Sequence, residues 1–146
     1  MLLVHSILRW AVLLTGIWAV IRAFKGVSGK TPFTAADNKA GLFFMIACDI
    51  QLLVGIILFF TSSLVTTARA DMGVAMKDPM LRFFTVEHET LAIIAIALVH
   101  IGKSKVKKAT DAAKKHMLAR NFYSIALVLI LIIIGLVMTK GQRGFY

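Results

Sequence analysis

The sequence contains a single cysteine, Cys48, among its 146 residues. One cysteine excludes a disulfide framework and a Cys-x-x-Cys motif, and the Cys-x-x-Cys-His motif that attaches haem covalently is also absent. The sequence shows no phosphate-binding loop and no recognisable pairing of a nucleophile with a base. No enzymatic activity is therefore predicted from a motif, although membrane redox activity is left open.

The chain also lacks a basic stretch ahead of its first apolar run, and Arg9 interrupts that run. A cleaved secretory signal begins with basic residues. We therefore expect the first apolar segment to be retained as a membrane anchor.

Charged residues are scarce, at 16%, whereas 59% of residues are hydrophobic and the mean hydropathy is +0.84. Soluble domains contain about 45–50% apolar residues. Several segments reach the roughly 17–25 residues that a helix needs to cross a bilayer, and none alternates like a barrel strand. The sequence predicts one all-α transmembrane domain over residues 1–146, an up-down-up-down four-helix bundle with helices at about 2–24, 36–60, 79–102 and 111–139.

Basic residues outnumber acidic ones by 17 to 7, which gives a net charge of +10. We reject nucleic-acid binding because the basic residues concentrate in the first and third expected loops. The positive-inside rule places those loops in the cytoplasm, and both termini and the second loop outside. We therefore predict a multi-pass membrane protein whose basic side attracts anionic lipid head groups.

Three local patterns refine this arrangement. Thr34-Ala-Ala-Asp37 is typical of a capping box with Asp in place of Glu, so the second helix should begin there. Met72, Met76 and Met80 recur at spacing four; we favour the apolar side of a short interfacial helix, although thioethers could also bind copper(I). His5 and His88 differ by 83 positions, as do Asn38 and Asn121, which indicates a 2+2 internal repeat in one orientation.

Two histidines, His5 and His88, form the centre of the candidate site. Ionisable side chains at membrane depth are expensive and usually face the interior of a bundle. Both histidines are expected at the outer side, on helices that enter from that side and lie diagonally across the bundle. Two such imidazoles could be the axial ligands of a b-type haem.

Charged residues are expected around this pair. Arg9, one turn from His5, could pair with a haem propionate or with Asp49 near the bilayer centre, and Arg82 could also lie near the propionates. Glu87 could orient a ligand imidazole by accepting its second N–H. Gln51 points about 200° away from Asp49 on the same helix.

Other arrangements of these residues stay open. His5, His88 and an acid could bind zinc or copper, Asp49 and Glu87 could form a protonatable transport pathway, or the residues could make a structural polar cluster. His100 lies about 18 Å from His88 along one helix, so the two cannot share a metal. His116, among lysines, is expected to be solvated.

Four short motifs are spread over nearly the whole chain: His5-Ser-Ile-Leu-Arg-Trp10, Asp49-Ile-Gln-Leu-Leu-Val-Gly55, Arg82-Phe-Phe-Thr-Val-Glu-His88 and His100-Ile-Gly-Lys103. They resemble a family of small bacterial four-helix membrane proteins that are often labelled cytochrome b-like. The resemblance implies haem at His5 and His88 and a location in the bacterial inner membrane. Some members have a histidine where this chain has Asp49, which argues against a second haem here.

The sequence thus predicts a membrane protein that binds one haem b near the outer face and transfers electrons with the quinone pool or a partner redox protein. A haem-free accessory or structural subunit of a membrane complex is the alternative, beside a metal-binding or proton-coupled membrane protein. Assembly into a homo-oligomer is left open.

Overall fold

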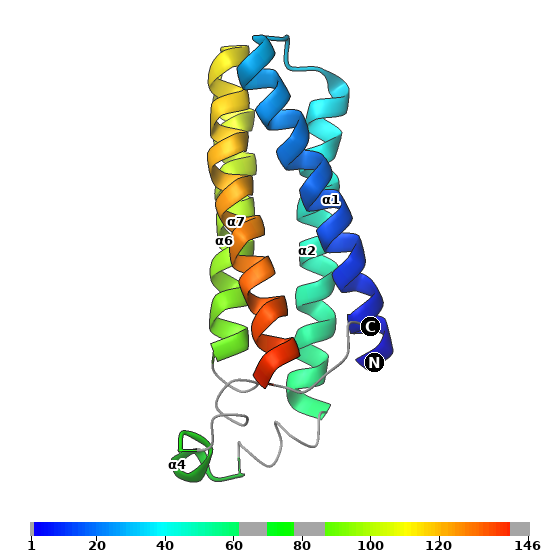
Figure 1. Ribbon diagram of the computed structural model, residues 1–146, viewed down its shortest axis with the longest axis vertical. Coiled ribbons are helices and arrows are strands. Elements are labelled where there is room, and N and C mark those ends of the chain that lie inside the picture. Colours follow the sequence, from blue (N-terminus) through cyan, green and yellow to red (C-terminus); the bar gives the residue numbers. More distant parts are fainter. Residues whose placement is uncertain (1, 62–69, 78–86, 141–146) are drawn as a thin grey trace.

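The computed structural model describes residues 2–61, 70–77 and 87–140 of the chain. Within these ranges no strand occurs, and four long helices stand side by side: α1 (Leu2–Gly29), α2 (Ala35–Thr61), α6 (His88–Lys108) and α7 (Ala112–Lys140) (Figure 1). A one-turn helix, α4 (Met72–Ala75), lies between α2 and α6 in the chain. The predicted all-α four-helix bundle is confirmed.

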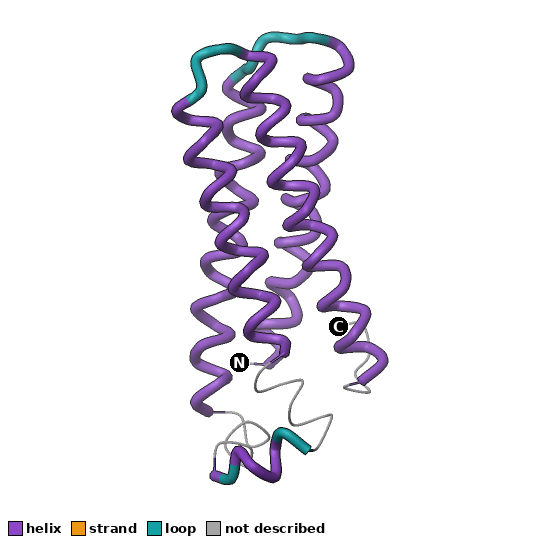
Figure 2. Tube along the Cα trace, turned by 90° about the vertical axis from the view of Figure 1, so that its left-hand side faces the viewer, coloured by secondary structure: helices purple, strands orange, loops and turns teal. Residues whose placement is uncertain are grey.

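The helices alternate in direction and pack as two hairpins. The turns at residues 30–34 and 109–111 lie at one end of the bundle, which we call the turn end (Figures 1 and 2). The opposite end, the far end, holds the first residues of α1 and α6 and the last residues of α2 and α7. Helix α1 packs on α2 and α7, and α6 packs on α7 and α2, so α1 and α6 are diagonal. This is the arrangement that a 2+2 repeat predicts.

Three helices are long and apolar enough to cross a membrane, over Leu3–Gly29, Ala35–Phe60 and Ala112–Val137. The described part of α6 has 21 residues and carries Glu89 in its first turn and Lys105, Lys107 and Lys108 in its last. Large apolar side chains also cover the outward faces, among them Leu14, Leu53 and Leu131, at 50–65% exposure. An apolar outer surface of this extent suits lipid contact.

Small residues allow the helices to approach closely at the turn end. A Cβ atom added at Gly41 of α2 would lie 2.6 Å from Oη of Tyr123 on α7, and one added at Gly102 of α6 would lie 2.5 Å from Cβ of Phe122. The buried Phe44 ring packs edge-on against Tyr123, with centroids 5.9 Å apart. Close backbone contact of this kind is the usual basis of helix association in membranes.

Two helices extend further toward the turn end than the sequence indicates. Helix α1 continues to Gly29 rather than residue 24, because Gly26 packs directly on the His116 ring, and the chain then turns at Lys30 with a φ of 52°. Helix α6 continues to Lys108 rather than residue 102, because Val106 is buried. The predicted start of the third helix, at residue 79, lies outside the described residues.

Local signals at helix starts agree with the structure. Thr34 N–H donates to Oδ2 of Asp37 at 2.8 Å, and Asp37 N–H approaches Oγ1 of Thr34 at 3.4 Å, so the predicted capping box is confirmed. The N–H of Met76 donates to the carbonyl of Met72, which begins α4, and both methionine side chains are exposed. Met80, the third methionine of the row, lies outside the described residues.

We expect Gly102→Ala to lower the free energy of unfolding by about 1–3 kcal/mol, because its methyl group would overlap the root of the Phe122 side chain. The matched control is Gly135→Ala, where a Cβ atom meets nothing within 4 Å. This control should be neutral or stabilising by up to about 1 kcal/mol. Denaturant titration in detergent, followed by circular dichroism, measures both changes; equal losses would contradict the close α6–α7 contact.

Candidate functional site

The structure brings the two predicted ligand histidines together at the far end. His5 lies in the first turns of α1 and His88 begins α6, and these helices are diagonal in the bundle. Their ring centroids are 6.2 Å apart, with the ring planes at 46°. The His88 side chain is only 20% exposed. The expectation that the two imidazoles meet across the core, at matched depth, is therefore met.

A glutamine that the sequence analysis did not select holds His5. The Nε2 group of Gln51, on α2, donates to the carbonyl oxygen of His5 at 3.0 Å and lies 3.4 Å from Nδ1 of the ring. On the same helix, a Cβ atom added at Gly55 would lie 3.9 Å from Nε2 of His5. Gln51 thus engages one ring nitrogen, and the glycine leaves space beside the other.

A second acid, Glu89, lies beside His88, and the expected role of Glu87 stays a prediction. Oε1 of Glu89 lies 3.6 Å from Nδ1 of His88, and Glu87 is the N-cap residue of α6, where its side chain makes no capping hydrogen bond. The other carboxylate oxygen of Glu89, Oε2, is buried and has no hydrogen-bond partner among the residues that the structure describes. A buried acceptor of this kind suits a nearby positive charge or donor.

The structure corrects the expected partner of Asp49. Asp49 lies near the middle of α2, and its Oδ1 atom is 2.6 Å from Nε2 of His100 on α6, so it pairs with His100 and not with Arg9. The positions of Arg9 and Asp49 along their predicted helices place both in the same half of the membrane. Those positions do not show which neighbouring helix Asp49 faces. Arg9 lies one turn from His5 on α1 and is partly buried, and Arg82 lies outside the described residues.

Nothing in the described ranges forms a group of three or more His, Cys, Asp or Glu side chains that could hold a metal ion. Zinc sites use three or four protein ligands. A zinc or copper site at His5 and His88 would therefore need a ligand from residues outside those ranges. A haem needs only two axial ligands, and the paired imidazoles supply this donor set.

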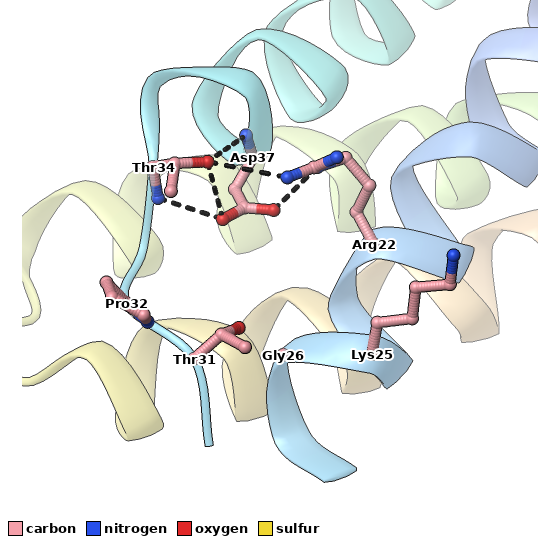
Figure 3. A pocket seen from close by; sticks show the side chains of 7 residues that line it. All are labelled: Arg22, Lys25, Gly26, Thr31, Pro32, Thr34 and Asp37. Carbon is pink, nitrogen blue, oxygen red and sulfur yellow. Dashed lines mark hydrogen bonds and ion pairs between the residues drawn. The ribbon is translucent and has the colours of Figure 1, made fainter. Parts of the chain in front are cut away.

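A second polar cluster lies at the turn end, around an open pocket of about 390 Å³ (Figure 3). The Arg22 guanidinium donates from Nε to Oδ1 of Asp37 at 2.6 Å and approaches Oγ1 of Thr34 at 3.4 Å. These groups also form the capping box of α2, so the polar side chains satisfy one another. The cluster ties the end of α1 to the start of α2 and is structural.

The expectation that His116 is solvated is wrong, because its side chain is only 1% exposed. Its Nε2 lies 3.0 Å from the carbonyl oxygen of Thr31, and its ring packs on Phe33 with centroids 5.3 Å apart. The helical spacing of His116 with Ala119, Tyr123 and Ala126, all buried, is the sequence signal that places it on the inner face of α7.

Comparison of the chain with protein-family models, with curated proteins and with solved structures finds no match. The resemblance to cytochrome b-like membrane proteins, which depends on short motifs, stays a prediction.

We expect Asp37→Ala to lower the free energy of unfolding by about 1–2 kcal/mol, because it removes both the α2 cap and the partner of Arg22. Lys39→Ala, an exposed change one turn away from the cap, should stay within about 0.5 kcal/mol of wild type. Denaturant titration in detergent compares the two variants, and indistinguishable stabilities would remove the structural role assigned to the cluster.

Proposed function

We propose that this protein binds one haem b between His5 and His88 and transfers electrons with the quinone pool or a partner redox protein. The observation that carries the proposal is the approach of the two imidazoles across the bundle diagonal, to a centroid separation of 6.2 Å. Two imidazoles bound on opposite sides of one metal ion, at about 2 Å each, have ring centres roughly 6 Å apart. The separation in the structure fits this requirement.

The neighbouring side chains would hold both rings for this role. Gln51 engages Nδ1 of His5 and Glu89 lies beside Nδ1 of His88, so in the proposed site Nε2 of each ring would bind the iron. Partners on the outer ring nitrogen fix the tautomer and orientation of a ligand histidine, and a carboxylate also raises its basicity. A haem held by two histidines supplies one-electron redox chemistry.

Apolar residues at the far end support the same role. Ile133 and Val137 of α7 are buried there, with Phe59 of α2 and Leu91 of α6 packed against them. Leu91 lies one turn from His88, so the apolar cluster would reduce the local polarity beside the proposed site. Water access and local polarity are among the properties by which a protein sets the redox potential of a haem.

We infer that the turn end faces the cytoplasm of a bacterium and that both termini lie outside. The basic residues of the α1–α2 and α6–α7 connections gather at the turn end, among them Lys25, Lys30, Lys107, Lys108 and Lys114. The positive-inside rule assigns such a side to the cytoplasm. The same residues would attract the anionic head groups of the inner leaflet.

We expect His5→Ala and His88→Ala each to abolish or convert the bis-histidine haem spectrum, because each removes one axial ligand. His100→Ala is the control, since His100 faces outward and lies about 18 Å along α6 from His88. The measurement is the Soret band of the purified protein before and after dithionite reduction. A colourless wild type from haem-replete cells would disprove haem binding and favour the accessory-subunit alternative.

The topology is tested by cysteine labelling in a Cys48→Ser background. Lys107→Cys should resist a membrane-impermeant maleimide in intact cells, because the turn end faces the cytoplasm, whereas Asp71→Cys, near α4 beyond the far end, should react. Permeabilised cells, in which both positions should react, provide the control. Labelling at position 107 in intact cells would reverse the orientation.

A further inference from the structure

The Asp49–His100 pair lies on the outer surface of the bundle at mid-height. Oδ1 of Asp49 is 2.6 Å from Nε2 of His100, yet the two side chains are 43% and 47% exposed. The pair joins α2 to α6 and belongs neither to the histidine site at the far end nor to the turn-end cluster. Polar groups at this depth usually face a bundle interior or another polar group.

The surface around the pair is apolar. On α2, Ile46, Leu53 and Ile56 share the helical face of Asp49, and each is at least 41% exposed. On α6, Ile93 shares the face of His100 and is 57% exposed, and the small residues Ala97 and Ser104, also exposed, lie one turn to either side of His100. Hydrocarbon would therefore surround a half-exposed ion pair in a single copy of the protein.

Each pair also has one donor and one acceptor to spare. Nε2 of His100 lies 2.6 Å from Oδ1 of Asp49, and among the described residues neither Nδ1 of His100 nor Oδ2 of Asp49 has a hydrogen-bond partner. A pair without net charge, which hydrocarbon favours, would present Nδ1–H as a donor and Oδ2 as an acceptor. The spare donor and the spare acceptor lie on one exposed patch. Such a patch is complementary to itself, which is the requirement for a two-fold interface.

We propose that the faces of α2 and α6 around Asp49 and His100 form the interface of a homodimer. Across a two-fold axis, Nδ1–H of each His100 would donate to Oδ2 of Asp49 in the second copy, and a closed ring of four hydrogen bonds would result. Ala97 and Ser104 allow the helices to approach, as small residues do at membrane interfaces. The interface would cover both ion pairs. The proposal does not depend on haem binding.

The test is single-molecule photobleaching of the fluorophore-labelled full chain in liposomes, at a series of protein-to-lipid ratios. The variant Asp49→Leu with His100→Leu removes the spare donor and acceptor and leaves an apolar surface that lipid tolerates. The dissociation constant of its dimer should rise about tenfold or more, because the variant lacks both hydrogen bonds between the copies. Each such bond contributes a modest free energy of association in a membrane, and the two contributions add. Circular dichroism and haem absorbance report whether the variant is folded.

Two matched variants separate the polar contact from general effects. Asp49→His with His100→Asp exchanges donor and acceptor and should dimerise within about threefold of wild type. Leu131→Ala with Ile132→Ala changes exposed residues of α7, away from the proposed interface, and should not affect dimerisation. A wild-type protein that stays monomeric at every protein-to-lipid ratio overturns the proposal. An Asp49→Leu, His100→Leu variant that dimerises like wild type also overturns it. So does a monomer that retains a quinone or another protein on this face.

Discussion

Close contact of glycine backbones with side chains of α7 is the constraint on which the bundle depends. Gly26 of α1, Gly41 of α2 and Gly102 of α6 each lie where a Cβ atom would come within 2.6 Å or less of an α7 side chain. All three contacts lie in the half of the bundle near the turn end. The Gly41 contact and the Phe44–Tyr123 ring pair join the diagonal helices α2 and α7 there. At the far end the other diagonal pair, α1 and α6, meets through His5 and His88.

Polar contacts between neighbouring segments are a second constraint on the described helices. Such contacts join Arg22 to Asp37, Asp49 to His100, Lys103 to Asn38 and His116 to the carbonyl of Thr31. Each pair connects two different elements. The polar contacts therefore help to determine which helices are neighbours and how far each is shifted along the next, because apolar faces alone allow several packings.

The sequence was sufficient for the features that depend on hydropathy, local spacing and depth. It predicted the four helices, the capping box at Thr34 and Asp37, and the meeting of His5 with His88. It was insufficient where the answer depended on the direction in which a side chain points around its helix. Asp49 has two neighbouring helices to face, and only the assembled bundle shows that it faces α6. Because Gln51 points about 200° away from Asp49, it then faces His5 on α1.

The position of α7 as the common partner of the other three helices has a consequence for the order of assembly. Chains are synthesised from the N-terminus, at about 5–20 residues per second. Helices α1, α2 and α6 are therefore made before the surface of α7 that contacts their glycines exists. Until α7 arrives, the side chain of His116 cannot cover Gly26, and the connection between α1 and α2 lacks its support. Helix α1 can pack on α2 before that point, but the close contacts at the turn end are complete only when the last described helix joins the first three.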